Sequence, residues 1–234
     1  MARWSRAARL LPADAVRVLD IGCAFGHGTR RLAPGRYVVG FDLSAASIER
    51  AARAGGARYL RAVADQIPIA DASVDAATCL DVLEHVPDQG ALIREAHRVL
   101  RPGGTLLLSV PHRGLLARFD SINRCPALWD LAEIAPARDL EAEHGEIHRH
   151  YSLAELRALL APRFRITGVW RTGLGVAELI NIPLLVLCKR VLRQPRLYHA
   201  LQYLYFSLYL AEDALPLGRH GYHLFVRAAR LEGR

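Results

Sequence analysis

The stretch VRVLDIGCAFGHG, residues 16–28, joins a short apolar run to a turn that is rich in glycine. An apolar run of this length, bounded by a turn, is typical of a buried β-strand. The turn contains Gly22, Gly26 and Gly28. Glycine has no Cβ, so the backbone at these positions can turn tightly and approach a ligand closely. The stretch therefore predicts a strand, a ligand-binding turn and a helix that begins near Thr29.

Strands and helices continue to alternate along the first half of the chain. RYVVGFDLS, residues 36–44, is a second apolar run with an acid near its end, and Ser44 is suited to cap the helix that follows. ARYLRAVAD, SVDAATCLD and TLLLSVP repeat the pattern, and Pro102-Gly103-Gly104 is placed as a helix stop before the last of them. This spacing favours a parallel sheet with helices on both faces.

The second half of the chain is less regular. SLAELRALLAP predicts a helix, residues 163–169 predict a strand, and YHLFVRAAR alternates as an antiparallel edge strand does. The predicted fold class is α/β: a Rossmann-like, doubly wound, mostly parallel seven-stranded sheet with an antiparallel last strand and a helical cap formed by insertions. We expect a single domain, 1–234, with an insertion at 113–150 and an apolar helical cap at 171–218.

Composition and charge exclude several classes of protein. Hydrophobic residues make up 52% of the chain, enough for a sizeable core, which excludes a disordered tail. The net charge is +8, but no basic run contains interleaved aromatic residues, so no nucleic-acid partner is expected. Four widely spaced cysteines indicate a reducing compartment, and Pro12 and Asp14 interrupt the apolar stretch that a signal peptide would need. A cytoplasmic protein is expected.

Carboxylates stand where the first three predicted strands end. Ligands of doubly wound sheets bind at these ends, and the glycine spacing is not the G-x-G-x-x-G that holds a dinucleotide. A dinucleotide needs a site for its pyrophosphate, whereas S-adenosylmethionine has no phosphate and carries a sulfonium cation. Asp20 suits its cationic portion, Asp42 can accept hydrogen bonds from ribose hydroxyls, and Asp65 can accept one from the adenine amino group. Asp71 and Asp75 end no predicted strand and are expected in solvated turns.

Four sequence blocks, in this order, resemble the class I S-adenosylmethionine-dependent methyltransferases, in particular the group that contains the ubiquinone and small-molecule methyltransferases. The blocks are VLDIGCAFGHG, VGFDLS, AVADQIPIADASVDAATCLDVLEHVPD and REAHRVLRPGGTLLLSVP. The resemblance is strong over residues 14–112 and looser over GEIHRHYSLAELRALL. It implies S-adenosylmethionine as the cofactor and S-adenosylhomocysteine as the product.

The resemblance also implies which residues bind the cofactor. Asp20, Gly22 and Gly26 line the methionine end, Asp42 the ribose, Asp65 and Gln66 the adenine, Leu80 and Asp81 border the sulfonium, and Cys23 and Leu43 complete the set. The chain departs from the family pattern at Ala24, where the family usually has glycine. Alanine adds one methyl group, so cofactor binding is expected to survive if φ is negative at this position.

Methyl transfer to oxygen or nitrogen needs an aligned acceptor, exclusion of water and removal of a proton, because the sulfonium is already an activated leaving group. Histidine is suited to remove the proton. The candidates are His148 and His150 in the cluster HGEIHRH, and His112 after the fifth predicted strand. The alternative is that these histidines bond backbone groups or cap helices. Nothing fixes the cluster on a helix face, so no metal is expected.

A strongly apolar segment follows, over residues 174–215. LGVAELINIPLLVLCKRVL is interrupted by Glu178, Asn181 and Pro183, so a membrane-spanning helix is not expected. Packing on the core, a homodimer interface and a wall for a lipophilic acceptor are alternative roles for it. Peripheral membrane contact through apolar surface and basic charge stays open.

These observations predict methyl transfer from S-adenosylmethionine to a small-molecule or lipid-like acceptor, at oxygen rather than at nitrogen or carbon. Two alternatives belong to other functional classes. One is a non-catalytic, methyltransferase-like dimeric scaffold. The other is a nicotinamide-dependent oxidoreductase, against which the glycine spacing argues.

Overall fold

The computed structural model describes residues 2–114, 117, 149–173, 180, 183–184, 186–198, 200–201, 207–208, 211 and 221–232. The chain divides into two compact units. Unit 1 comprises Met1–Val110, Leu153–Val169 and Phe225–Arg234, and unit 2 comprises Pro111–Ser152 and Trp170–Leu224. The predicted insertion and the predicted cap both fall within unit 2.

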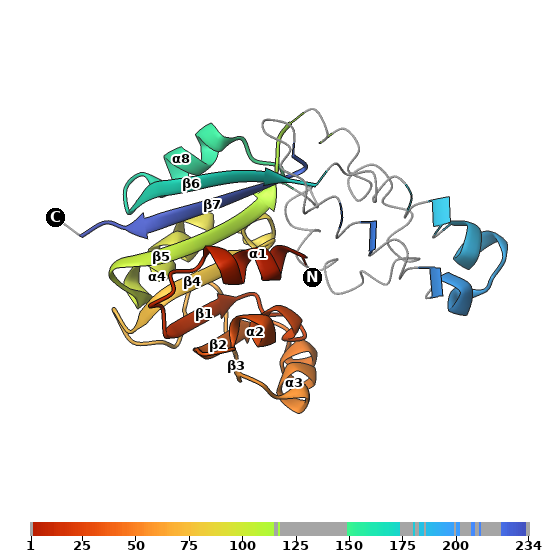
Figure 1. The fold of residues 1–234 in the computed structure, drawn as a ribbon, viewed down its shortest axis with the longest axis horizontal. Helices are drawn as coiled ribbons and strands as arrows, with labels where there is room; N and C mark the ends of the chain where they lie inside the picture. The colour runs from red at the N-terminus through yellow and green to blue at the C-terminus, as the bar shows by residue number, and fades with distance from the viewer. Residues whose placement is uncertain are drawn as a thin grey trace. The chain divides into compact units, whose positions relative to one another are not determined.

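Seven strands form one sheet in the order β3-β2-β1-β4-β5-β7-β6 (Figure 1). The strands are β1 (Arg17–Ile21), β2 (Tyr37–Asp42), β3 (Arg58–Arg61), β4 (Val74–Leu80), β5 (Leu100–Pro111), β6 (Phe164–Thr172) and β7 (His223–Arg230). The first five pair in parallel, and the arrow of β7 runs opposite to those of β5 and β6 in Figure 1. The predicted Rossmann-like fold is confirmed.

Helices alternate with the strands as predicted, except that an unpredicted helix precedes β1 and that no helix lies between β3 and β4. They are α1 (Ala2–Leu10), α2 (His27–Leu32), α3 (Ala45–Ala54), the 3-10 helix η1 (Leu83–His85), α4 (Gln89–Val99), α8 (Leu153–Leu160) and the π-helix η5 (Val186–Val191). Ser44 caps α3, since its hydroxyl accepts from the N–H of Ser47 over 3.2 Å. Among the described residues, no helix is both long and apolar enough to cross a membrane.

The strand order reverses between β1 and β4. The chain passes from β1 outward to β2 and β3 on one side, and then returns to β4 on the other. All seven residues of β4 are buried, as expected for a central parallel strand that is covered on both faces. A switch of this kind opens a crevice at the carboxyl ends of the two strands, and ligands of open α/β sheets bind there.

The predicted boundaries differ from the structure at several strands; β6, for example, ends at Thr172 rather than at residue 169. β3 ends at Arg61, so Asp65 lies four residues beyond the strand rather than at its end. β5 already begins at Leu100, so Pro102-Gly103-Gly104 lies inside it. The register with β4 shifts at this point, because Leu100 pairs with Val74 whereas Thr105 pairs with Ala76, and the intervening residues form an irregularity.

Asp75 corrects another expectation, because it does not lie in a solvated turn. Its side chain belongs to buried β4 and is only 8% exposed. Its Oδ2 accepts the N–H groups of Val16 and Arg17 over 3.0 and 2.7 Å, and its Oδ1 pairs with the Arg17 and Arg101 side chains. Although burial opposes it, this set of donors lowers the Asp75 pKa to about 2.

Candidate functional site

The turn after β1 has an unusual backbone. Gly22, Ala24 and Gly26 have left-handed φ values of 69°, 44° and 72°. A Cβ at Gly22 would lie 2.3 Å from Cγ2 of Val82, so this position requires glycine for space as well as for φ. A Cβ at Gly26 would lie 2.5 Å from the Tyr59 hydroxyl oxygen, so the turn packs closely against side chains at both glycines and leaves Ala24 exposed between them.

Ala24 does not have the negative φ on which tolerance of alanine depends. The left-handed region costs a residue with a Cβ about 1–2 kcal/mol. The cause lies in its backbone N–H, which donates to Oδ2 of Asp42 over 2.9 Å. The turn thus holds backbone strain where the family usually has glycine.

Asp42 lies at the end of β2, beside the turn, as predicted. While Oδ2 accepts from Ala24, Oδ1 accepts the N–H of Ser44 over 2.9 Å. The side chain is half-buried. Each carboxylate oxygen has two lone pairs, so both oxygens can accept a further hydrogen bond. The neighbouring Leu43 is 46% exposed.

Asp20 lies beneath the turn rather than at its surface. The side chain is only 1% exposed, and its two oxygens accept from the hydroxyl groups of Thr29 and Thr78, each over 2.7 Å. Burial raises the Asp20 pKa to about 6 and the Asp42 charge adds to this, although the two hydroxyl groups oppose the rise. Asp20 can therefore affect a ligand through its charge, and its contacts with the threonines fix the turn.

Asp65 and Gln66 project from the loop after β3. Both are exposed, and within the described part of the chain neither side chain forms a hydrogen bond. The next residue, Ile67, is 3% exposed and anchors the loop. A carboxylate and an amide are therefore available to a ligand at this point.

Leu80 and Asp81 mark the end of β4. Leu80 is 3% exposed, whereas Asp81 is half-buried and has a φ of 56°. The Ser109 hydroxyl donates to Oδ1 of Asp81 over 2.8 Å, and the Asp81 N–H donates to the Ser109 carbonyl over 3.0 Å. These bonds join the carboxyl ends of β4 and β5. Cys23, in the turn after β1, is buried, and its N–H donates to the Phe41 carbonyl over 2.9 Å.

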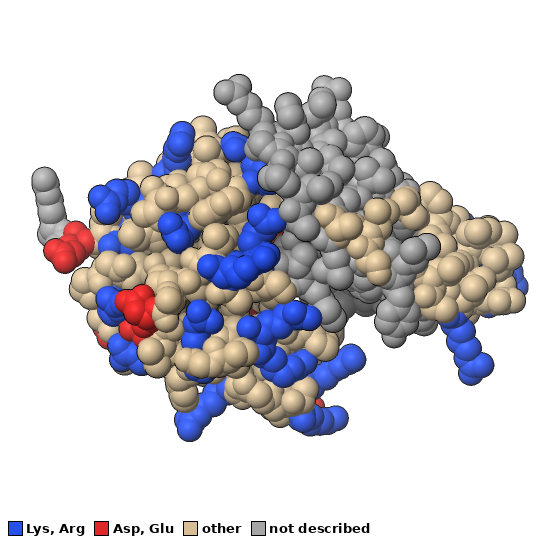
Figure 2. Space-filling model, viewed as in Figure 1, with Lys and Arg blue, Asp and Glu red and all other residues tan. Residues whose placement is uncertain are grey.

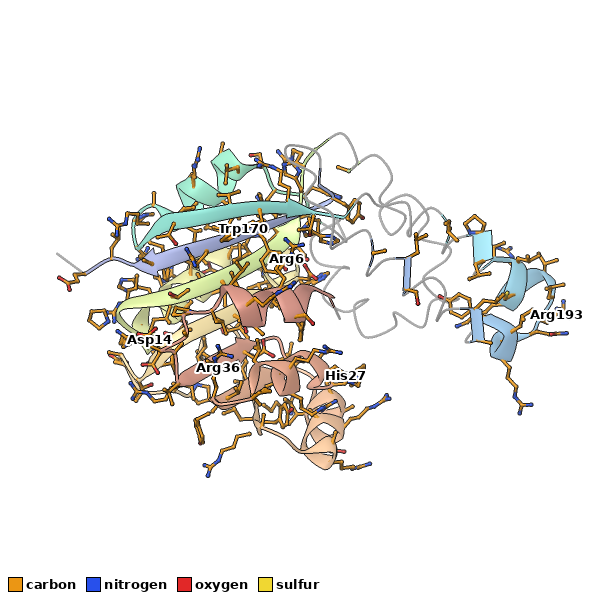
Figure 3. The ribbon with its side chains drawn as sticks, viewed as in Figure 1. Arg6, Asp14, His27, Arg36, Trp170 and Arg193 are labelled. Carbon is orange, nitrogen blue, oxygen red and sulfur yellow. The ribbon has the colours of Figure 1, made fainter. Side chains whose placement is uncertain are left out.

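His27 begins α2 and is exposed (Figure 3). Its Nδ1 lies 2.9 Å from Nη2 of Arg30. A guanidinium group only donates, so Nδ1 accepts and the ring is neutral in this arrangement. Partial desolvation, and then the charges of Arg30 and Arg50, lower the His27 pKa. His27 is therefore held in its neutral form.

Two of the three candidate histidines lie in one part of unit 2. His112 is 8% exposed, and its Nδ1 lies 2.9 Å from the Gly221 carbonyl oxygen. A carbonyl only accepts, so Nδ1 carries the hydrogen and Nε2 holds the lone pair of the neutral ring. The His150 ring meets the Tyr222 ring edge to face, with centroids 6.5 Å apart. His148 lies outside the described residues.

Other residues of the site were missed in the sequence. Thr78 interrupts an apolar buried strand, and a buried hydroxyl requires a partner, so it could have indicated a contact with Asp20. Nothing in the sequence pointed to Gly221. A Cβ there would lie 2.3 Å from the Thr172 backbone nitrogen, so only glycine permits this approach. Within the described ranges, no group of three His, Cys, Asp or Glu side chains is placed to hold a metal.

Residues 19–108 match a family model described as a methyltransferase domain. Over these residues, 90 of the 234, the chain is similar to methyltransferase domains. The match begins in β1 and ends in β5, and it includes the glycine turn, Asp42, the Asp65–Gln66 pair and the end of β4. S-adenosylmethionine is the cofactor of this class of methyltransferase.

Curated proteins that are named methyltransferases are similar to part of this chain. A ubiquinone biosynthesis O-methyltransferase of Xanthomonas oryzae pv. oryzae is 38% identical over 126 residues, which are 50% of this chain and 48% of that protein. A probable S-adenosylmethionine-dependent methyltransferase of Mycolicibacterium smegmatis is 38% identical over 102 residues, 41% of this chain and 38% of that protein. The chain thus spans about half the length of the first relative that it matches.

Solved structures share the fold over nearly the whole chain. An S-adenosylmethionine-dependent methyltransferase from Mesorhizobium loti has a TM-score of 0.61 at 24% identity, covering 98% of both chains. A Thermotoga maritima protein titled a possible histamine N-methyltransferase has a TM-score of 0.63 at 18% identity, covering 98% of this chain and 88% of that one. At these identities the likeness shows the fold alone.

Proposed function

We propose that this protein transfers a methyl group from S-adenosylmethionine to an oxygen atom of a small, lipophilic acceptor. The observation that carries the proposal is the left-handed backbone of the turn after β1, with the Asp42 carboxylate hydrogen-bonded beside it. The choice of oxygen and of a lipophilic acceptor is supported by the similarity to proteins named ubiquinone biosynthesis O-methyltransferase. Those names describe the relatives, so the substrate of this chain is a proposal.

The proposed cofactor site follows the carboxyl ends of β1 to β4. Asp42 accepts hydrogen bonds from the ribose hydroxyls, and Asp65 with Gln66 binds the adenine. Gly22, Cys23 and Gly26 lie along the methionine portion, with the charge of Asp20 beneath it. Leu43, Leu80 and Asp81 complete the walls. Among these groups, the carboxylate of Asp42 and the side chains of Asp65 and Gln66 have unused hydrogen-bonding capacity.

S-adenosylmethionine supplies an electrophilic methyl group on a sulfonium. An acceptor hydroxyl forms the new O–C bond as the S–C bond breaks, and a base removes the hydroxyl proton. His112 is the proposed base, because the Gly221 carbonyl holds its Nδ1 hydrogen and leaves Nε2 as the basic nitrogen. His150 and His148 are the other candidates.

Contact with a membrane would bring the protein to a lipophilic acceptor, and we propose that it occurs. Leu187, Val191 and Leu192 at η5 are 48%, 65% and 46% exposed, and Lys189 lies among them in the sequence. Arg193 projects from the segment that follows η5 (Figure 3). Lys and Arg side chains are widely spread over the described part of unit 1 on the face that Figure 2 shows. Apolar side chains beside cations suit an anionic lipid surface.

Vesicle co-sedimentation tests this contact. Vesicles that contain phosphatidylglycerol should bind the wild-type protein more strongly than vesicles of phosphatidylcholine alone, and Leu187→Ser with Val191→Ser should reduce the bound fraction. Absence of binding to either vesicle would refute the membrane contact. A homodimer formed through these side chains would instead double the mass measured by light scattering, and the same substitutions would restore the monomer.

The methyl transfer itself is tested with labelled cofactor. The protein is incubated with S-[methyl-³H]adenosylmethionine and either a long-chain alkyl catechol or the matching alkyl aniline. Label is expected in the methyl ether of the catechol. Label in the aniline alone would refute O-methylation. A protein that binds the cofactor but labels neither acceptor, nor a wider panel of phenols, would favour the non-catalytic scaffold.

A further inference from the structure

We propose that Arg98 and Glu95 of α4 position the loop that carries Asp65 and Gln66, and thereby give the site its selectivity for adenine. The inference rests on the proposed cofactor site and extends it to two residues that do not contact the ligand. Both act through the backbone of the loop, so they are positioning residues rather than catalytic ones.

Arg98 holds the loop at three places. Its Nη2 donates to the Ile67 carbonyl over 2.7 Å, and its Nη1 donates to the Ile69 carbonyl over 2.8 Å. The same Nη1 pairs with Oδ1 of Asp71 over 2.6 Å. One guanidinium group therefore fixes the loop at every second residue from 67 to 71.

Glu95 fixes both the loop and the arginine. Its Oε2 accepts the Ile67 N–H over 2.8 Å. The same oxygen accepts from Nη2 of Arg98, and Oε1 accepts from Nε of Arg98, both over 2.8 Å. This is the bidentate arrangement of a carboxylate with a guanidinium. Both backbone groups of Ile67 are thus held by side chains from one turn of α4.

The two proposed adenine ligands come directly before the fixed residue. Asp65 and Gln66 are exposed and belong to no helix or strand, since β3 ends at Arg61 and β4 begins at Val74. A loop of this length without regular structure would lose conformational entropy when it orders around a ligand. Because Ile67 is fixed in advance, Asp65 and Gln66 start from a restricted position.

The contacts made at position 98 require the guanidinium group of an arginine. A hydrogen bond from Arg98 lowers the Glu95 pKa, and Glu95 and then Asp71 raise the Arg98 pKa, so both groups stay charged over the whole physiological range. Lysine would keep the charge of Arg98 but has no planar fork of donors to reach Glu95 and two carbonyls together. Arg98→Lys therefore removes the geometry and retains the charge.

Arg101 provides a matched control. It too pairs with a carboxylate, since its Nε lies 3.0 Å from Oδ1 of Asp75. Asp75 is near the start of β4, at the amino edge of the sheet, whereas the proposed adenine site is at the carboxyl edge. Arg101→Lys thus repeats the chemical change away from the loop.

Calorimetric titration with two ligands tests the inference. One is S-adenosylhomocysteine, and the other is S-inosylhomocysteine, in which an oxo group replaces the adenine amino group. Wild-type protein should prefer the adenine ligand. Arg98→Lys and Glu95→Gln should each lower the affinity for S-adenosylhomocysteine about tenfold and reduce the preference for the adenine ligand. Arg101→Lys should change neither the affinity nor the preference. In an Asp65→Ala, Gln66→Ala background, Arg98→Lys should have no further effect.

The possible failures can be told apart. If wild-type protein binds S-adenosylhomocysteine but folded Arg98→Lys and Glu95→Gln bind both ligands as wild type does, the positioning role is wrong and the cofactor site stands. An equal loss for both ligands would also refute the selectivity claim. If the wild-type protein does not bind S-adenosylhomocysteine, both the cofactor site and this inference fall. Hydrogen exchange should additionally show faster exchange at the Ile67 N–H in folded Arg98→Lys, and unchanged exchange would contradict the role.

Discussion

The backbone N–H of Ala24 donates to Oδ2 of Asp42 over 2.9 Å, and Ala24 adopts a φ of 44° in making this bond. The bond joins the turn after β1 to the end of β2, the two parts of the chain that would enclose the ribose and methionine portions of the cofactor. Alanine bears a steric cost at this φ that glycine does not. The hydrogen bond between Ala24 and Asp42 is therefore formed at a cost to the stability of the folded chain.

Ala24→Gly should relieve this cost. We expect the free energy of unfolding to rise by about 0.5–1 kcal/mol, because the gain in backbone freedom of the unfolded chain offsets part of the relieved strain. Urea unfolding measures the change. Ala52→Gly, in the last turn of α3, should instead lower the stability, by up to about 1 kcal/mol. A loss of stability in Ala24→Gly would show that the left-handed φ is not a source of strain.

Asp42→Asn should weaken ribose recognition specifically. Hydrogen bonds to a charged acceptor contribute about 1.5–3 kcal/mol each, so the affinity for S-adenosylhomocysteine should fall by roughly 10- to 100-fold. The 2′-deoxy analogue lacks one of the two donors, so the variant should lose less affinity for it than for S-adenosylhomocysteine. Equal losses for both ligands, measured by calorimetry, would place the ribose elsewhere.

Asp20→Asn should change how stability depends on pH. The Asp20 pKa is 3.8 in the unfolded reference and about 6 in the folded protein. The folded state therefore binds this proton more tightly, so the stability that protonation contributes is complete below about pH 4 and is lost as the pH rises through 6. Asparagine stays neutral. The stability of the variant relative to wild type should rise between pH 4 and pH 7.5 by up to ~3 kcal/mol. Urea unfolding at both pH values is the measurement, and a pH-independent difference would contradict the raised pKa.

His112→Gln should lower turnover without lowering the affinity for the cofactor. Loss of a general base typically costs 10²- to 10⁴-fold in rate. Gly221→Ala should have a similar, smaller effect, because the new Cβ would collide with the Thr172 backbone and displace the carbonyl that orients His112. His97→Gln alters a histidine that contacts the Leu231 carbonyl instead, and it should retain turnover. If His112→Gln keeps full kcat, His150 and His148 become the candidates.

Local patterns predicted the fold and the places of three features near the carboxyl ends of β1 and β2. The glycine turn, the Ser44 cap and the position of Asp42 depend on neighbours within a few residues, and the structure places all three as predicted. The sign of φ at Ala24 was not predictable, because it follows from a hydrogen bond to Asp42, 18 positions further along the chain.

Other contacts could not be predicted from the sequence, because they join segments that are distant along the chain. Asp71 and Asp75 are four residues apart and look alike in the sequence, but one pairs with Arg98 of α4 and the other with Arg17 of β1 and Arg101 of β5. Which arginine meets which acid depends on the strand order. The Asp20–Thr78 contact depends in the same way on the pairing of β1 with β4.

Isothermal titration of the wild-type protein with S-adenosylhomocysteine tests the central claim most directly. The turn after β1, Asp42, Asp65 and Gln66 should together bind one molecule per chain with a dissociation constant in the range of ~1–100 μM. If neither S-adenosylhomocysteine nor S-adenosylmethionine gives a binding signal at concentrations up to ~1 mM, these residues do not form a cofactor site and the proposed function is wrong.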